Sequence, residues 1–417
     1  MEIKQAARRY DDHSVQGIYT RHRGKAASLN VYRRNAKPYQ AISEDLSRKS
    51  SNHGPKNSYV ITPKAQKQED KVCKYWISGH CARGNKCWYL HSWCHGDGFT
   101  MLAKLEGHKK VVIVRNLGYN QNEESYIILS NISCFSLLQA VRGIALPLGS
   151  EKLYSASGDG TLRTWDCHSG QCACLSNLGD EVGSMITEGP WVFVGMKDVI
   201  EAWNTQTAQE LSLKGPVGQV HSMVIANNML FAGAQNGFIF AWKGSSEVAN
   251  PFQLVASMEG HSGAVLCLTV GEKKLYSGSV DHTIGVWDTD TLQCIKTLNG
   301  HEDAVTSLLH CNGCLFSCSL DCSIKVWFAT VGENWEVIYT HKEENGVLAL
   351  CGMNDAETKP VLFCSCNDNT VRLYDLPSFT ERGRLYSKRE VRVIHRGPFP
   401  LFFTGDGSGS ITVWKWL

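Results

Sequence analysis

The sequence lacks several features that mark common functional classes. No run of about 18 apolar residues occurs in the 417-residue chain, so no transmembrane helix is predicted. The first residues, Met1-Glu-Ile-Lys, do not contain the apolar core of a secretory signal peptide. The chain also contains no phosphate-binding Walker loop, no Gly-x-Ser-x-Gly elbow and no His-Glu-x-x-His motif. These absences argue against a membrane protein, a secreted protein and the enzymes that such motifs identify.

A disulfide scaffold is not predicted either, although the chain has 17 cysteines. Their number is odd and the chain is long, whereas disulfide-rich proteins are short and secreted. We therefore expect reduced thiols in a nuclear or cytoplasmic protein. Most of the thirteen cysteines after Cys94 should be small buried side chains. The pair Cys311 and Cys314 encloses Asn-Gly, which is typical of a hairpin turn rather than of a metal or redox site.

The small net charge of +2 conceals an uneven distribution. Residues 1–95 carry 18 Lys and Arg against 7 Asp and Glu, whereas the rest of the chain carries 24 against 33. Residues 1–72 have no apolar periodicity and are rich in Arg, Lys, Ser, Asn and Gln, so we predict a disordered basic arm there. The arm is either a solvated tail or a segment that contacts phosphates or directs nuclear import, and its basic clusters are too short to decide.

A short cysteine-rich segment follows the arm, over residues 73–95. Four candidate metal ligands have the spacing C-x7-C-x5-C-x3-H, namely Cys73, Cys81, Cys87 and His91. Three thiolates and one imidazole complete a tetrahedral Zn²⁺ shell, and a closed shell indicates one structural ion rather than a catalytic one. Gly79 and Gly84 lie where the chain must turn tightly between ligands. Cys94 and His95 are alternative ligands, but they break the spacing.

This segment resembles the Cys3His (CCCH) zinc fingers of RNA-binding proteins. In that family aromatic side chains stack between the bases of single-stranded RNA, and the matching positions here hold Trp76 and Tyr89. The candidate nucleic-acid contacts are these two with their aromatic and cationic neighbours: Tyr75, Trp76, Trp88, Tyr89, Lys74, Arg83 and Lys86. Residues 73–95 contain no Asp or Glu, which suits a polyanion. The alternative is that the aromatic side chains only cover the metal.

The chain from residue 99 to residue 417 repeats with a period of about 40 residues. Each copy has two short alternating strands and ends on an aromatic residue: Trp165, Trp203, Trp242, Trp287, Trp327, Tyr374 and Trp414. Gly-His pairs precede three copies, at His108, His261 and His301. This pattern resembles the WD-repeat family, which implies an all-β propeller with seven blades.

In that family a His, an Asp and a Trp join a strand Ser or Thr in a buried hydrogen-bond network. Blades four and five contain the full set: His261, Asp281 and Trp287, then His301, Asp321 and Trp327. The last blade lacks a fourth strand, and the segment Phe99–Leu105 is predicted to supply it. Such pairing would close the ring, remove exposed sheet edges and place the finger beside the junction.

Blade one is irregular. His108 and Trp165 are 57 positions apart, against 26 between the equivalent residues of blades four and five. The extra residues 113–141 show no WD features, so we predict an insertion that comes from alternative splicing or an imperfect gene model. This blade should be the least stable of the seven.

One Cys3His finger with seven WD repeats, over about residues 73–417, resembles the plant family of CCCH zinc-finger WD-repeat proteins. The resemblance implies a non-catalytic RNA-binding adaptor, in which the finger contacts single-stranded RNA and the propeller holds protein partners. The alternatives are a protein scaffold with a structural finger and a DNA-binding regulatory protein. Neither a small-molecule substrate nor a membrane is expected. The Arg that cullin-ligase receptors carry two residues after Trp-Asp is absent, so that role is not favoured.

Overall fold

A computed structural model describes residues 68–108, 140–147, 150–245, 251–330 and 334–417, which belong to one structural unit. Residues 1–67 of the predicted arm and residues 113–139 of the predicted insertion lie outside the described residues. The secondary structure is dominated by strands, and the all-β prediction is confirmed. No helix in the described ranges is long and apolar enough to cross a membrane.

From residue 99 onward the described strands form seven antiparallel blades, and in the first six the chain order runs from the centre to the rim. Blade one contains β5 (Val141–Ala145), β6 (Lys152–Ser157), β7 (Thr161–Asp166) and β8 (Cys172–Asn177). Blades two and three share the long strand β12 (Glu210–Ala226). It follows β9 (Ser184–Glu188), β10 (Trp191–Gly195) and β11 (Lys197–Asn204), and it precedes β13 (Met229–Ala234), β14 (Ile239–Gly244) and β15 (Phe252–Met258).

The other four blades follow the same plan. Blade four contains β16 (Val265–Gly271), β17 (Lys274–Ser279), β18 (Ile284–Asp288) and β19 (Cys294–Leu298). Blade five contains β20 (Val305–Cys311), β21 (Cys314–Ser319), β22 (Ser323–Ala329) and β23 (Trp335–Lys342). Blade six contains β24 (Val347–Asn354), β25 (Pro360–Cys366), β26 (Thr370–Asp375) and β27 (Thr380–Tyr386). Blade seven contains β28 (Val391–Arg396), β29 (Leu401–Asp406) and β30 (Ser410–Trp416).

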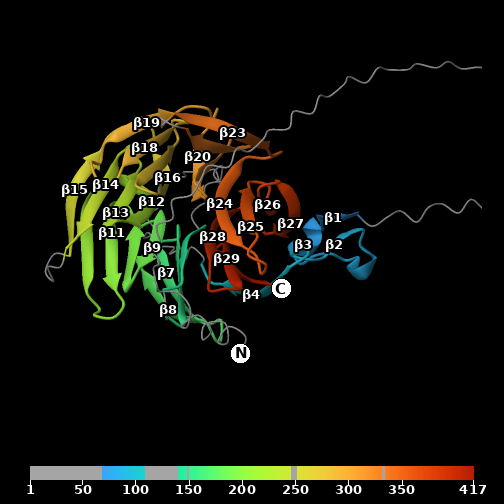
Figure 1. Cartoon of the computed structure of the whole chain (residues 1–417). Helices are drawn as coiled ribbons and strands as arrows, with labels where there is room; N and C mark the ends of the chain where they lie inside the picture. Colours follow the sequence, from blue (N-terminus) through green and yellow to red (C-terminus); the bar gives the residue numbers. More distant parts are fainter. Residues whose placement is uncertain (1–67, 109–139, 148–149, 246–250, 331–333) are drawn as a thin grey trace, which may run out of the picture. The chain divides into compact units, whose positions relative to one another are not determined.

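The blades form a closed ring. Each innermost strand contacts the innermost strand of the next blade, in the order β5, β9, β12, β16, β20, β24 and β28, and β28 contacts β5 (Figure 1). Blade seven obtains its fourth strand from β4 (Phe99–Glu106), which pairs with β30 from Trp416 opposite Phe99 to Ser410 opposite Glu106. The strand predicted from residues 99–105 therefore closes the ring, and we call this β4–β30 pairing the seam.

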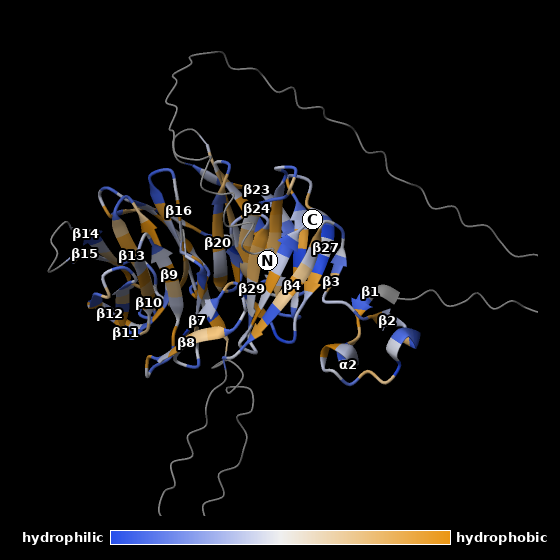
Figure 2. Ribbon diagram, turned by 90° about the horizontal axis from the view of Figure 1, so that it is seen from below, coloured by the Kyte–Doolittle hydropathy of each residue, from blue (hydrophilic) through white to orange (hydrophobic). Residues whose placement is uncertain are grey.

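Packing between blades explains the periodic tryptophans. Trp287 of blade four lies in one buried cluster with Phe231 and Ile239 of blade three. Trp327 of blade five is likewise clustered with Tyr276 of blade four. A large flat side chain at the end of each third strand covers the face of the preceding blade, so one aromatic residue is needed per repeat. Figure 2 shows hydrophobic colour running through the sheets.

The predicted polar network is present in blades four and five. In blade five His301 joins Asp321 through Nδ1 (2.7 Å) and Ser317 through Nε2 (2.7 Å), and the Trp327 indole N–H donates to the same serine (2.8 Å). The Ser323 hydroxyl also donates to Asp321 (2.6 Å). Every member has a partner, which is the condition under which a protein core tolerates polar groups.

Blade six contains a different network that the sequence analysis missed. The carboxylate of Glu343 accepts hydrogen bonds from Arg372 and from the Tyr374 hydroxyl (2.6 Å), and the thiol of Cys364 lies 3.6 Å from it. Tyr374 stands where the other blades have tryptophan. Because a carboxylate replaces the usual histidine, the blade needs a buried cation, and Arg372 supplies it.

Three predicted boundaries differ from the structure. Residues 68–72, assigned to the arm, form strand β1 (Gln68–Val72), because β2 (Tyr89–Leu90) of the finger pairs with them in parallel. Residues 94–96, partly assigned to the finger, form β3 (Cys94–Gly96), because the free edge of β27 pairs with them. Val141, assigned to the insertion, begins β5 because its fully buried side chain packs in the core of blade one.

The network predicts a pH-dependent contribution to stability. Burial raises the pKa of Asp321, but hydrogen bonds from Ser323, His301 and the Glu302 N–H outweigh burial and lower this pKa to about 2. We expect Asp321→Asn to lower the free energy of unfolding by about 2 kcal/mol near neutral pH. Because the folded pKa lies below the unfolded one, the contribution is present above about pH 4 and is lost as the pH falls toward about 2.

Urea unfolding at several pH values measures this contribution. Asp290→Asn, which changes an exposed carboxylate on a neighbouring blade, is the matched control and should leave stability unchanged. Equal stability of the two variants at neutral pH would contradict the prediction.

Candidate metal centre and nucleic-acid interface

The four predicted metal ligands meet in space. One ligand atom from each of Cys73, Cys81, Cys87 and His91 lies within 4.8 Å of all the others. Cys73 and Cys87 are 2% and 5% exposed, so two thiols are shielded from water while Cys81 and His91 are half-buried. Cys94, the rejected alternative ligand, lies instead in β3 against the propeller.

Short local structures position the ligands. Cys73 precedes the single helical turn α2 (Lys74–Ile77) and accepts backbone hydrogen bonds from Trp76 (3.0 Å) and Ile77 (3.0 Å). The 3₁₀ turn η1 (Gly84–Lys86) leads directly into Cys87. Both predicted turn glycines have positive φ, 78° at Gly79 and 48° at Gly84. The finger is therefore a series of tight turns. Binding of a metal by its four ligands supplies the stability that a hydrophobic core would otherwise provide.

The electrostatics of the thiols differ. Burial raises the pKa of Cys73 above its ordinary value. At Cys87 the backbone N–H of Tyr89 is the main influence, and it lowers the pKa of the thiol. Backbone N–H groups that point at sulfur stabilise a thiolate, which is the form that binds metal.

The residues fit a zinc ion. Three sulfur atoms and one imidazole are the donor set of closed structural zinc sites. The His91 Nε2 atom is buried and has no hydrogen-bond partner among the described residues, as expected of a nitrogen that binds a metal. The cluster is therefore consistent with the zinc site of a CCCH finger.

A second group of possible ligand atoms occurs in blade six, where Glu343, Cys364 and Cys366 lie within 4.8 Å of one another. The Glu343 carboxylate is already bonded to Arg372 and Tyr374. Burial raises the pKa of Cys364 well above its ordinary value, so this thiol stays protonated. We interpret this group as the core network of blade six rather than as a metal site.

The predicted nucleic-acid contacts fall into two groups. Tyr75, Trp88 and Tyr89 are 72%, 51% and 45% exposed, which is unusual for large aromatic side chains. The cations Lys74, Arg83 and Lys86 are also exposed. Trp76 differs, because its ring stacks on His91 with the centroids 5.6 Å apart and 14° between the planes, and it also contacts Trp93 (5.0 Å).

Comparison with known proteins places the chain in a family. The WD domain, G-beta repeat family matches residues 252–288 and 292–327. Zinc finger CCCH domain-containing protein 17 of Oryza sativa subsp. japonica is 53% identical over 351 residues, which are 84% of this chain and 74% of that protein. Zinc finger CCCH domain-containing protein 48 of Arabidopsis thaliana is 52% identical over 347 residues, covering 83% and 74%. This chain belongs to the plant zinc finger CCCH domain-containing proteins.

Two residues of this CCCH protein that contact the finger or its connection were missed by the sequence analysis. Trp93 lies between Trp76 and the ammonium group of Lys104, which is 3.5 Å from the centre of the Trp93 ring. Trp93 lies outside the ligand spacing of the finger, and Lys104 is not one of the residues that recur in the WD repeats. The only signal in the sequence was that Trp93 is a third tryptophan shortly after the last ligand. A single tryptophan at that place matches no motif, so it did not indicate a contact.

We expect the finger of this CCCH protein to hold one zinc ion per chain. Cys81→Ser should reduce the zinc content to nearly none, because a tetrahedral shell that loses one thiolate binds much more weakly. Elemental analysis of the purified full chain measures the content. Cys172→Ser, at an exposed cysteine of β8, is the matched control. Two zinc ions in the wild type would show that Glu343, Cys364 and Cys366 bind metal after all.

Proposed function

We propose that this protein is a non-catalytic adaptor of the nucleus or cytoplasm, whose zinc-loaded finger binds single-stranded RNA while the propeller holds protein partners. The observation that carries the proposal is the exposure of Tyr75, Trp88 and Tyr89 on a segment that contains no acidic residue. A folded domain seldom leaves three large aromatic side chains in water, and unpaired bases stack on such rings.

Charge supports the same proposal. Lys74, Arg83 and Lys86 are exposed around the aromatic side chains and supply cations for phosphates. Residues 1–95 carry 18 Lys and Arg against 7 Asp and Glu, so the basic residues before the finger add to the attraction. We assign Trp76 to the metal side, since His91 and Trp93 cover its ring.

Single-stranded RNA is favoured over duplex DNA. Proteins that read the major groove insert a helix of several turns or a two-stranded ribbon. The α-helix of the finger, Lys74–Ile77, has four residues. Turns and exposed rings suit a flexible strand whose bases are splayed apart.

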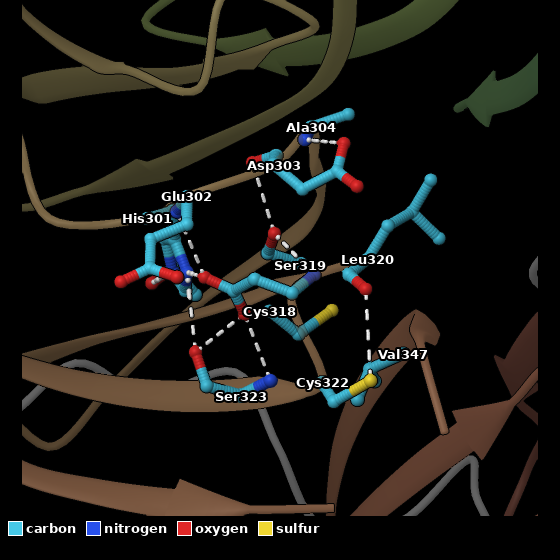
Figure 3. Close-up of polar contacts among 12 residues, drawn as sticks. His301, Glu302, Asp303, Ala304, Cys318, Ser319, Leu320, Cys322, Ser323 and Val347 are labelled. Atoms are coloured by element: carbon cyan, nitrogen blue, oxygen red, sulfur yellow. Dashed lines mark hydrogen bonds and ion pairs between the residues drawn. The ribbon is translucent and has the colours of Figure 1, made fainter. Parts of the chain in front are cut away.

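Protein contact by the propeller is supported by two exposed aliphatic side chains. Val280 and Leu320, 44% and 38% exposed, follow β17 and β21 in neighbouring blades. The backbone N–H of each donates to Ala264 (3.0 Å) or Ala304 (3.2 Å), so the loops hold both in place. In Figure 3 the Leu320 side chain extends away from the polar network. Fixed aliphatic side chains at a surface suit a protein partner.

The finger is tested by measuring binding of a fluorescent single-stranded RNA and of a duplex DNA to the full chain. Tyr75→Ala, Trp88→Ala and Tyr89→Ala should each weaken RNA binding by about 1–3 kcal/mol, the value of one stacked base. Tyr339→Ala, which removes an exposed aromatic ring of similar exposure from β23, is the matched control.

A salt series tests the cations independently. Lys86→Gln should make the dependence of log affinity on log salt shallower by about 0.7, because one phosphate contact is lost from a single strand. Binding to neither nucleic acid would favour the scaffold alternative, in which the finger is structural. Preference for the duplex would favour the DNA-binding alternative.

A further inference from the structure

Trp93 connects the finger to the propeller. On the finger side its ring contacts Trp76, whose other contact is the metal ligand His91. On the propeller side Trp93 packs against the buried cluster that contains Phe99, Phe402 and Trp414. The Trp93 side chain therefore packs against both the finger and the core of the propeller, which the sequence patterns show as separate parts.

Lys104 is the second part of this connection. It lies in β4, the strand that closes the ring, opposite Thr412 of β30. Its ammonium nitrogen is buried, has no hydrogen-bond partner among the described residues, and stands 3.5 Å from the centre of the Trp93 ring. A buried cation is costly unless something compensates it, and here the face of the indole does so. The Trp93 ring and the negative charges of Asp406 and Glu106 together offset the cost of burying this ammonium group in the seam.

The backbone fixes Trp93 in this place. Its carbonyl accepts a hydrogen bond from the Tyr386 N–H (2.8 Å) at the end of β27. The next residues form β3, which pairs with β27 from Leu385 opposite Cys94 to Gly383 opposite Gly96. Gly98 then accepts a hydrogen bond from the Leu417 N–H (2.8 Å) just before β4 begins. The connection is thus a strand of the propeller rather than a free tether.

We propose that Trp93 is a positioning residue that couples zinc binding in the finger to closure of the propeller ring. The contacts run in sequence from the ligand His91 through Trp76 and Trp93 to Lys104 of β4, with separations of 5.6, 5.0 and 3.5 Å. The residues of the finger are held together by the metal, so its loss frees Trp76. The Trp93 ring then loses its packing against Trp76. As a result, β4 separates from β30 at the seam more often.

The same coupling fixes the direction of the finger. Because Trp93 is anchored to both units, RNA on the exposed aromatic side chains lies at a set orientation to the blades. This part of the inference rests on the proposed RNA binding, whereas the coupling between zinc and the seam does not.

Amide hydrogen exchange on the full chain, without RNA, tests the coupling. When zinc is removed from the wild type by a chelator, exchange in β4 should become at least about tenfold faster, while β18 and β22 in blades four and five stay unchanged. Cys81→Ser should reproduce this effect without a chelator. In Trp93→Ala, exchange in β4 should already be fast with zinc bound, and zinc removal should not change it further.

Two variants separate positioning from general stability. Trp93→Phe keeps an aromatic face for both neighbours and should restore the zinc response. Trp335→Ala removes a half-buried tryptophan that also lies near a lysine, Lys274 (5.9 Å), but its ring lies in blade five and packs against Tyr276 of blade four (5.6 Å), so it should leave the response of β4 intact.

Two results would overturn the proposal. One is unchanged exchange in β4 while residues 73–91 exchange rapidly after zinc removal. The other is a full zinc response in Trp93→Ala. Neither depends on RNA, so this proposal and the RNA-binding proposal can fail separately.

Discussion

The pairing of β4 with β30 is the constraint on which the rest of the structure depends. A ring of blades is stable only when its last sheet is complete, because an incomplete sheet exposes the edge of a strand to water and to other chains. Here the completing strand comes from the part of the chain directly after the finger. The finger is therefore next to the seam as a consequence of chain order. Trp93 and Lys104 occupy that junction because both termini of the propeller meet there.

Much of this fold could be predicted from the sequence. The period near 40 residues, the Gly-His pairs and the terminal tryptophans identify blades, because each reports a contact that every repeat must make. The ligand spacing identified the metal cluster for the same reason, since four ligands around one ion leave little freedom in the loops between them. Closure by residues 99–105 followed from counting strands.

What the sequence did not reveal are the contacts that occur once. Glu343 of blade six stands in place of the histidine and is bonded to Arg372 and Tyr374, and no repeat pattern indicates such an exchange. Trp76 matched a family position for base stacking, and the pattern did not indicate that its ring also lies against His91 and Trp93. Strand β3 is too short and too polar to show alternation, and it forms only because β27 offers an unpaired edge. Pairings of this kind depend on geometry that arises after folding.

The continuity of β12 has a mechanical consequence. Its residues Glu210–Ala226 run from the rim of blade two to the centre of blade three, so both blades form one sheet of seven strands. Elsewhere the connection between blades is a loop that can bend while each sheet stays whole. A twist applied to blade two therefore reaches blade three through the backbone of β12, which bends at residues 215–218, where its register with β11 breaks and Gly215 and Gly218 have positive φ (143° and 79°). We therefore expect blades two and three to move together when the ring is deformed, whereas a loop joins each of the other blades to the next.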